Sequence, residues 1–258
     1  MTGSWLRADL GPGVTALVTT RADGVSRAPY EGLNVGLHVG DSPELVRANR
    51  AAVRDSLGSP VAYSDQVHGR TVRVVSEPPV GDSVGQGDAL VTARPGLGLA
   101  VMVADCLPVL LADPEGGIAG VAHAGRRGLA AGVVPAAVEV MVALGAHTDR
   151  IRAYLGPAIC GRCYEVGQEV QAQVAAAVPA AFATTAWGSP ALDLAAGARE
   201  QLAEAGLREV GDSGICTYED NRFYSFRRHG TTGRFAGVVV IDPGDTPPTL
   251  LAAEPGWS

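Results

Sequence analysis

A cysteine and a histidine flank two neighbouring apolar segments, at positions from which they can share one metal ion. Cys106 directly precedes one apolar run, and His123 ends the next. Residues 113–116 between the runs are typical of a turn, so the runs are predicted to form a β-hairpin. With those four residues as the loop, Ala112 pairs with Gly117 and Cys106 pairs with His123. Directly opposed residues have Cβ atoms about 4.5–5.5 Å apart, close enough for a thiolate and an imidazole to bind the same ion.

The third candidate ligand is His68, in the segment Asp65-Gln-Val-His-Gly69. Two histidines and one cysteine form a known catalytic zinc set that leaves a fourth position open for water or substrate. Zinc in such a site lowers the pKa of bound water to about 7. Spacing alone leaves two interpretations, because a single distant histidine is more often a packed or surface residue than a ligand.

The segments around these residues alternate between strands and helices. Ser42 before Pro43 is typical of a helix start, and this helix is expected to run to Leu57 and stop at Gly58. Further helices are predicted at 135–144, 166–178 and 192–205, and strands at 14–19, 71–75, 97–104, 107–112, 118–123 and 235–241. The pattern indicates an α/β fold with one or two mixed sheets.

Length and composition indicate a globular chain. The 258 residues are 47% hydrophobic and 18% charged, and we expect one domain over 1–258, with a core of about 14–242 and an irregular tail over 243–258. No apolar run reaches the roughly 18–20 residues that a membrane span needs, and the first residues do not resemble a signal peptide, so we expect a cytoplasmic protein. The net charge of −7 argues against a nucleic-acid surface. The sequence contains no lysine, which excludes Schiff-base chemistry.

Several sequence blocks, in this order, resemble the YfiH-like family, also called laccase-domain or polyphenol oxidoreductase proteins. The resemblance covers roughly residues 15–241. The blocks are Gly24-Val-Ser26, Pro29-Tyr30, Gly32-Leu-Asn34-Val-Gly-Leu-His-Val-Gly40, Gln66-Val-His-Gly69, Ala104-Asp-Cys-Leu-Pro108, His123-Ala-Gly125, Leu155-Gly-Pro-Ala-Ile159, Tyr164-Glu-Val-Gly167 and Thr232-Gly-Arg234.

The resemblance implies a zinc ion held by His68, Cys106 and His123, with copper as the less favoured metal. It implies purine nucleoside phosphorylase activity on adenosine, inosine and methylthioadenosine, with adenosine deaminase activity as well. Purine nucleoside and phosphate are then the partners of a monomer or small homo-oligomer. The implied fold is a single-domain α/β/β/α sandwich with mixed sheets, related to cysteine hydrolases of the cytotoxic necrotizing factor type.

Arginines are the natural phosphate holders for phosphorolysis. Arg127 is the first candidate because it lies close after His123, and it joins the three ligands as a candidate catalytic residue. Arg227 and Arg234 are further candidates, for which a surface or salt-bridged role is an equal alternative.

Three polar residues are candidates for contacts near the substrate. Asn34 can hydrogen-bond ribose or base, or it can be a turn residue between glycines. Asp105, beside Cys106, can orient a ligand or bridge backbone groups. Gln66 has the same two interpretations.

The sequence departs from the family pattern at two positions. The family usually has His-Ala-Gly-Trp-Arg-Gly, whereas this chain has Arg126 in place of the tryptophan. Arginine can stack on a purine, and it can also favour an anion such as phosphate. Phe226 stands where the family often has tyrosine, which removes one hydroxyl.

Two other motifs are interpreted as unrelated to function. Cys160-Gly-Arg-Cys163 lacks an obvious second pair, since Cys106 and Cys216 are far apart in sequence, so these are taken as incidental thiols. Gly85-Gln-Gly87-Asp lacks the full phosphate-loop fingerprint and is expected to be a solvated turn.

The sequence bears on four alternative functions. The five histidines are too few for a multicopper laccase, so copper polyphenol oxidation would be incidental. A thiol hydrolase would use Cys106 as nucleophile and His123 as base. An ordinary zinc deaminase would need a His-x-Glu and Pro-Cys-x-x-Cys signature, which is missing. The fourth is a non-enzymatic or accessory role, for example as an accessory enzyme of cell-wall precursor editing, which the resemblance implies because some family members are linked with it.

Overall fold

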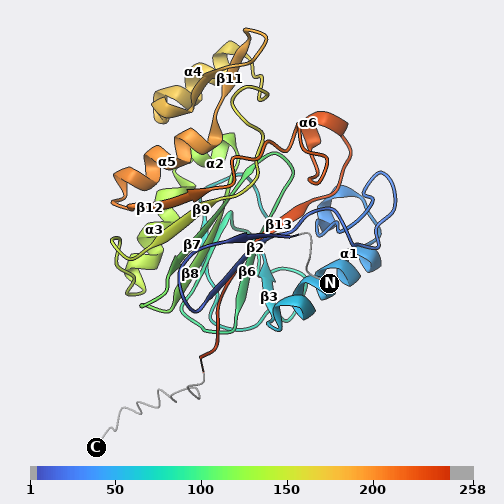
Figure 1. The fold of residues 1–258 in the computed structure, drawn as a ribbon, viewed down its shortest axis with the longest axis vertical. Helices are drawn as coiled ribbons and strands as arrows, with labels where there is room; N and C mark the ends of the chain where they lie inside the picture. Colours follow the sequence, from blue (N-terminus) through green and yellow to red (C-terminus); the bar gives the residue numbers. More distant parts are fainter. Residues whose placement is uncertain (1–4, 245–258) are drawn as a thin grey trace, which may run out of the picture.

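A computed structural model gives the fold and describes residues 5–244. Two β-sheets lie face to face, and helices cover both outer faces (Figure 1). These are the layers of the predicted α/β/β/α sandwich, so the predicted fold is confirmed. The irregular tail predicted from residue 243 lies, from residue 245 onward, outside the described residues. Within residues 5–244, no helix is both long enough and apolar enough to cross a membrane.

The first sheet has five strands in the order β1-β2-β13-β6-β3. Its pairs are antiparallel except for β3 and β6, which run parallel. Its strands are β1 (Leu6–Ala8), β2 (Val14–Val18), β3 (Val61–Tyr63), β6 (Gly98–Val103) and β13 (Phe235–Ile241).

The second sheet has six strands in the order β12-β9-β7-β8-β5-β4, with parallel pairs at both edges. Its strands are β4 (Val72–Val74), β5 (Ala89–Thr92), β7 (Leu107–Asp113), β8 (Ile118–Ala124), β9 (Arg152–Leu155) and β12 (Glu209–Asp212). A separate hairpin joins β10 (Phe182–Thr184) and β11 (Pro190–Leu192).

Helix α1 covers the first sheet, whereas α2, α3 and α5 cover the second. Helix α4 packs beside β10 and β11, and α6 is a single short turn near the end of the described chain. The helices are α1 (Pro43–Leu57), α2 (Arg126–Ala131), α3 (Val133–Ala143), α4 (Gln168–Ala177), α5 (Leu194–Glu204) and α6 (Phe226–His229), with 3₁₀ turns at Leu37–Val39 and Pro179–Ala181.

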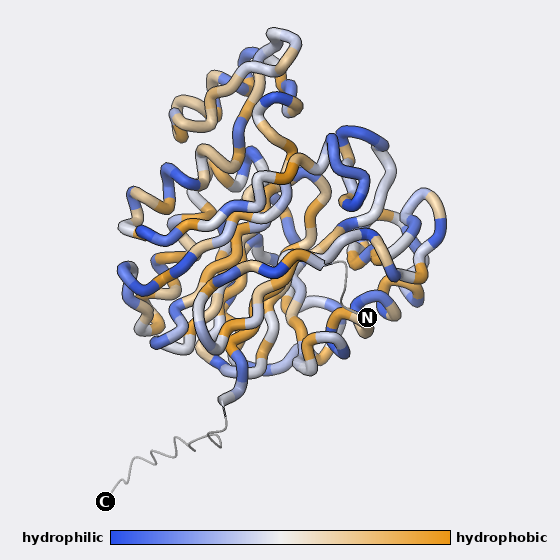
Figure 2. The backbone as a smooth tube through the Cα atoms, in the orientation of Figure 1, coloured by the Kyte–Doolittle hydropathy of each residue, from blue (hydrophilic) through white to orange (hydrophobic). Residues whose placement is uncertain are grey.

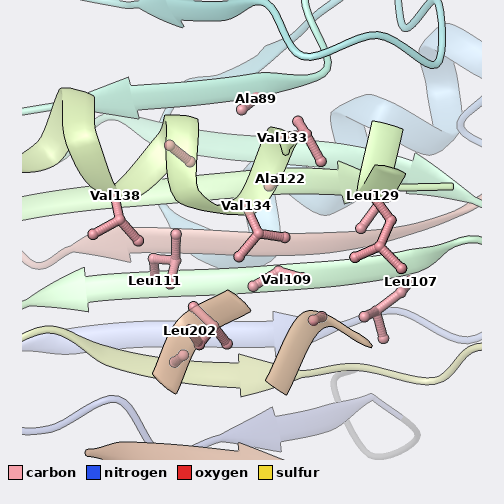
Figure 3. Close-up of a cluster of buried hydrophobic side chains, with 14 of the residues drawn as sticks. Ala89, Leu107, Val109, Leu111, Ala122, Leu129, Val133, Val134, Val138 and Leu202 are labelled. Carbon is pink, nitrogen blue, oxygen red and sulfur yellow. The ribbon is translucent and has the colours of Figure 1, made fainter. Parts of the chain in front are cut away.

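The central strands bury both faces, which explains their continuous apolar sequences. On β7, Leu107, Val109 and Leu111 face the helices, whereas Leu110 packs between the two sheets. Figure 3 shows the helix-facing cluster, in which Val134 of α3 lies over this strand. The hydropathy colouring shows the same segregation, with apolar strands inside and polar segments outside (Figure 2). A rigid framework with apolar faces on both sides therefore carries the segment around Cys106.

Helix α1 begins and ends where the sequence predicts. Pro43 occupies its first turn, and Gly58 closes it in the left-handed conformation with φ +63°. Ser42 is the N-cap residue, but its hydroxyl donates to the Glu44 carboxylate and makes no capping hydrogen bond to the helix. The predicted boundary is thus correct and the predicted capping contact is not.

The β7–β8 hairpin forms in a register two residues away from the predicted one. Ala112 pairs with Ala119, and Pro108 pairs with His123, so the loop is 114–117 and not 113–116. A two-residue shift keeps each side chain on its face, whereas a one-residue shift would reverse it. Cys106 therefore lies just before β7, diagonal to His123 and not directly opposite it.

Candidate metal centre

Three side chains from three separate segments converge at one end of the second sheet. The ligand atoms of His68, Cys106 and His123 lie within 4.8 Å of one another. The Cys106 Sγ is 3.9 Å from His68 Nε2, and the two imidazole rings meet edge to face with centroids 4.7 Å apart. His123 is buried at the end of β8, whereas His68 is exposed. The hairpin and the preceding loop thus bring together the set that the sequence singled out.

Asp88, directly before β5, holds both histidines in place. Its buried carboxylate accepts a hydrogen bond from His123 Nδ1 at 2.9 Å, which leaves Nε2 of His123 facing the other two donors. The same carboxylate accepts backbone N–H groups from the 67–69 turn, at 2.8 Å from His68 and 2.7 Å from Gly69. A carboxylate behind a metal-binding histidine fixes the tautomer and the ring orientation.

Two residues of the centre have backbone conformations with positive φ, which residues other than glycine rarely adopt. His68 has φ +61° and Asp105 has φ +90°. Such conformations cost of order 1–3 kcal/mol and persist only where the surroundings enforce them. Here the Asp88 hydrogen bonds enforce the His68 turn, and Asp105 is fixed by Thr217 and by the backbone of Arg227.

Gly125 leaves a space between the three donors. A Cβ at this position would lie 3.0 Å from the Cys106 Sγ, 3.0 Å from His68 Cδ2 and 3.8 Å from His123 Nε2. The backbone of Gly125 has φ −77° and ψ 168°, which any residue can adopt. The need for glycine is therefore steric and comes from the space between the ligands.

The charges of the centre support a thiolate. Burial alone would raise the pKa of Cys106, but His123 and the hydrogen bond of His68 outweigh it and lower this pKa to about 6. Burial would lower the pKa of His123, but the Cys106 thiolate and Asp88 raise it to about 9. Burial also tends to raise the pKa of Asp88, yet hydrogen bonds from His123 and the 67–69 turn lower it. The thiolate is the form of cysteine that binds metals and attacks electrophiles.

The centre opens into a cavity of about 460 Å³ whose wall is rich in cationic and aromatic groups. Among the lining residues, Asp105 is the one carboxylic acid. Arg227 lies over the Tyr164 ring, with the guanidinium carbon 5.0 Å from the ring centroid. The lining residues are His38, Gln66, His68, Met102, Val103, Ala104, Asp105, Cys106, His123, Arg126, Arg127, Tyr164, Phe226, Arg227 and Arg234.

The three arginines suggested by the sequence all line this cavity, in different environments. Arg127 is exposed and donates a long 3.5 Å hydrogen bond to the carbonyl of Val67. Arg227 donates to the Glu165 carbonyl at 2.6 Å. Arg234 is half-buried and donates to backbone carbonyls of its own turn, and burial lowers the pKa of its guanidinium. Of the three guanidinium groups, that of Arg127 is held least firmly by other protein groups.

Gln66 and Asp105 line the cavity while their side chains bind protein groups. Gln66 exchanges two hydrogen bonds with the backbone of Met102, at 2.7 and 2.9 Å. Asp105 accepts from the Thr217 hydroxyl at 2.7 Å and from the Arg227 backbone at 2.6 Å. Both residues therefore position the loops that carry the ligands.

Asn34 does not line the cavity. It is buried, and its side-chain oxygen accepts from the backbone of Gly36 and of Arg234, at 3.0 and 2.8 Å. Its amide nitrogen donates to Asp41 at 2.8 Å. The structure gives Asn34 the role of joining two loops.

Sequence reasoning missed several residues of the centre. Asp88 belongs to the segment predicted as a solvated turn, yet it is buried. A carboxylate directly before an apolar strand was the available signal. Tyr164 and His38 had been noted only within family blocks, and Met102 only within a strand. Their place in the cavity wall depends on tertiary packing.

The sequence shows no second cysteine pair for Cys160-Gly-Arg-Cys163, but the structure places Cys216 and Glu219 beside this motif. Cys160, Cys163, Cys216 and Glu219 form a second group whose ligand atoms lie within 4.8 Å of one another. Parallel pairing of β9 with β12 brings the two segments together.

The chain matches a known protein family over most of its length. The family model described as multi-copper polyphenol oxidoreductase laccase matches residues 15–242. The chain belongs to this family, which is the YfiH-like family that the sequence blocks resembled. The candidate metal centre thus lies within the family region.

Among curated relatives, a purine nucleoside phosphorylase of Streptomyces griseus is 54% identical over 228 residues, covering 87% of this chain and 93% of the relative. A purine nucleoside phosphorylase of Mycobacterium tuberculosis is 46% identical over 232 residues, covering 89% and 92%.

Solved structures share the fold. YlmD from Geobacillus stearothermophilus superposes with a TM-score of 0.86 at 33% identity, covering 93% of this chain and 96% of the other. A Neisseria meningitidis protein gives a TM-score of 0.83 at 40% identity, covering 93% and 99%.

Proposed function

We propose that this chain is a zinc-dependent purine nucleoside phosphorylase that acts on adenosine, inosine and methylthioadenosine, with adenosine deaminase as a side activity. The observation that carries the proposal is the convergence of His68, Cys106 and His123 at a cavity walled by arginines and aromatic rings. The names of the curated relatives agree with the phosphorylase part of the proposal.

The donor set fits a catalytic zinc ion. Two imidazoles and one thiolate are ligands of such sites, the Gly125 space lies between them, and Asp88 supports both histidines. Bound there, the ion would supply a Lewis acid with a coordination position open to substrate. Hard cations such as Mg²⁺ are disfavoured by the sulfur donor.

The arginines of the cavity wall are suited to bind phosphate. Arg126 and Arg127 are exposed, and they lie three and four residues after His123 along the chain. Guanidinium groups bind phosphate oxygens in pairs through charge-assisted hydrogen bonds. In the proposed reaction they hold phosphate while one of its oxygens bonds to the ribose carbon, as the bond from that carbon to the purine nitrogen breaks and the purine leaves.

The aromatic side of the cavity is suited to the purine base. Tyr164 and Phe226 line it, and Arg227 already stacks on the Tyr164 ring. Rings and planar guanidinium groups stack on nucleobases in a way that tolerates different substituents. This tolerance agrees with adenosine, inosine and methylthioadenosine as alternative substrates.

The test is phosphate-dependent release of adenine from adenosine by the full chain, before and after removal of metal with a chelator. We expect release to require phosphate, to stop on chelation and to return with Zn²⁺. His68→Ala should abolish release, whereas His147→Ala, an exposed histidine elsewhere on the chain, is the matched control and should retain it. Zinc-loaded protein that forms neither adenine nor inosine would contradict the proposal.

A thiol hydrolase is the second candidate, because Cys106, His123 and Asp88 also lie next to one another in space, as a nucleophile, a base and an orienting carboxylate would. Such an enzyme would keep its activity in chelator and lose it on alkylation of Cys106. Alkylation must be tested on metal-free protein, since a bound ion would protect the thiol.

A further inference from the structure

Two short turns at the edge of the second sheet present metal-binding groups with the same spacing. Cys160 and Cys163 lie in the turn after β9, and Cys216 and Glu219 lie in the turn after its parallel neighbour β12. In each turn the carbonyl of the first residue accepts the backbone N–H three positions later, at 2.9 Å from Cys163 and 3.2 Å from Glu219. The motif is therefore Cys-x-x-Cys facing Cys-x-x-Glu.

Backbone contacts hold the two turns against each other. Ala158 and Cys216 form a parallel β-bridge, and the Thr217 N–H donates to the Ala158 carbonyl at 3.0 Å. The Cys160 N–H points at the Cys216 Sγ, with a nitrogen–sulfur distance of 3.4 Å. As a result, three Sγ atoms and one carboxylate oxygen lie within 4.8 Å of one another.

We propose that Cys160, Cys163, Cys216 and Glu219 bind one Zn²⁺ ion in a closed structural site. Four donors from paired Cys-x-x spacings match the tetrahedral structural zinc sites, which leave no position for substrate. Thiolate donors select zinc over Mg²⁺ and Ca²⁺. This site is separate from the centre at Cys106 and does not depend on the proposed phosphorylase activity.

Burial and rigidity at the cluster agree with an ion. Cys163 and Cys216 are only 7% and 8% exposed. Thiols bind a divalent ion as thiolates, so binding releases their protons. Arg228 donates to the carbonyls of Thr217 and Tyr218 at 2.7 and 2.8 Å, which holds the Cys216–Glu219 turn in place.

An ion at this cluster would also brace the catalytic cavity. Thr217, inside the Cys216–Glu219 turn, donates to the Asp105 carboxylate at 2.7 Å, and the Ile159 N–H donates to the Asp105 carbonyl at 3.0 Å. Asp105 has the strained φ of +90° and directly precedes Cys106. The closed site therefore stabilises the segment that presents the Cys106 thiolate.

The experiment uses the full-length Cys106→Ser chain, in which the cluster supplies all three remaining cysteines. Reduced, chelator-stripped protein is loaded with Zn²⁺ or with Co²⁺ alone. Metal per chain is measured after gel filtration, thiols are counted with a thiol reagent in native buffer, and the Co²⁺ spectrum reports thiolate charge transfer and tetrahedral geometry.

We expect about one Zn²⁺ per chain, three thiols protected by the ion and exposed by chelation, and a tetrahedral, sulfur-rich Co²⁺ spectrum. The double variant with Cys106→Ser and Cys163→Ser should no longer bind this Zn²⁺ ion. A Cys106→Ser chain that binds no Zn²⁺, or whose three thiols react equally fast with and without it, would overturn the proposal. So would a chain whose reduced cluster forms only a disulfide on exposure to air, whether or not Zn²⁺ is present.

A second pair of variants keeps the test valid if Cys163→Ser does not fold. Glu219 is exposed, so Glu219→Gln should fold, bind Zn²⁺ about 10-fold or more weakly and shift the Co²⁺ spectrum. Glu165→Gln, an exposed carboxylate two residues after Cys163, is the matched control and should leave both unchanged. Equal Zn²⁺ affinity of the two variants would remove Glu219 from the site and contradict the four-ligand proposal.

Discussion

Residues 5–244, which the structure describes, contain two clusters of cysteine-containing donors, and they differ in the number of donors and in their surroundings. The centre at Cys106 has three donors, a space at Gly125 and a cavity of about 460 Å³ in front of it. The cluster at Cys163 has four donors, two of them deeply buried cysteines, and braces a turn. Zinc sites with an open position are catalytic, and closed four-ligand sites are structural. With zinc bound at both clusters, as proposed, the first would carry the chemistry and the second would stabilise the fold.

The largest expected effect comes from filling the open site. Gly125→Ala should reduce zinc at the Cys106 centre to background, because the added methyl group would lie 3.0 Å from the Sγ. Gly167→Ala is the matched control, since Gly167 is also a helix N-cap with extended backbone and has nothing within 4 Å of its Cβ position. Metal analysis of both variants measures this, and full zinc content together with full activity in Gly125→Ala would refute the assigned open position.

Removing the support of the histidines should have the next largest effect. Asp88→Asn should lower zinc affinity or activity about 10- to 100-fold, because the amide is a poorer acceptor for His123 Nδ1–H and for the 67–69 turn. Asp113→Asn, at a second buried carboxylate paired with Arg150, is the control for general destabilisation. It should lower the thermal midpoint and leave zinc affinity unchanged. Comparable loss of zinc in both variants would argue against a specific role for Asp88.

In the metal-free protein at pH 7, Cys106 should be alkylated about 10-fold or more faster than Cys163 and Cys216. The pKa of Cys106 is lowered to about 6, so its thiolate predominates above pH 6 and its reaction slows only as pH falls through that value. Burial raises the pKa of Cys163 and Cys216, which therefore remain thiols. Peptide mass spectrometry after limited iodoacetamide treatment shows which cysteine is modified first. Modification of Cys163 before Cys106 would contradict the prediction that Cys106 is the more reactive thiol.

The smallest expected effect concerns substrate choice at the open site. Arg126→Trp restores the usual family residue and removes one cation from the cavity wall. We expect a KM for phosphate about 3- to 10-fold higher, consistent with loss of one charge-assisted contact, and an unchanged zinc content. Arg208→Ala, an exposed arginine outside the cavity, serves as control. An unchanged KM for phosphate would leave Arg126 without a role in anion binding.

The regular elements were predictable because their sequences carry the signal locally. Phe235–Ile241 and α1 were predicted with their observed bounds, since a doubly buried strand is a continuous apolar run and a helix has end signals at Pro43 and Gly58. Short strands such as β5 and β9 were missed because their few residues carry little pattern. The β7–β8 register was wrong because turn residues alone do not fix loop bounds.

The sites were predictable only as far as residue type allowed. His68, Cys106 and His123 stood out by their chemistry and by the family resemblance. Asp88 did not, because its partners come from β8 and from the 67–69 turn. The approach of Cys216 to Cys160 depends on the parallel pairing of β9 and β12. The matching Cys-x-x-Cys and Cys-x-x-Glu spacings were the one available signal.

The most direct test of the two-cluster account is anomalous X-ray diffraction at the zinc edge from crystals of the full chain loaded with Zn²⁺. The account predicts two peaks per chain, one among His68, Cys106 and His123 and one among Cys160, Cys163, Cys216 and Glu219. The first should show a solvent or substrate ligand facing the cavity, and the second should show none. Zinc-loaded crystals without a peak at the Cys106 centre, or with a solvent ligand at the second cluster, would contradict the division into an open and a closed site.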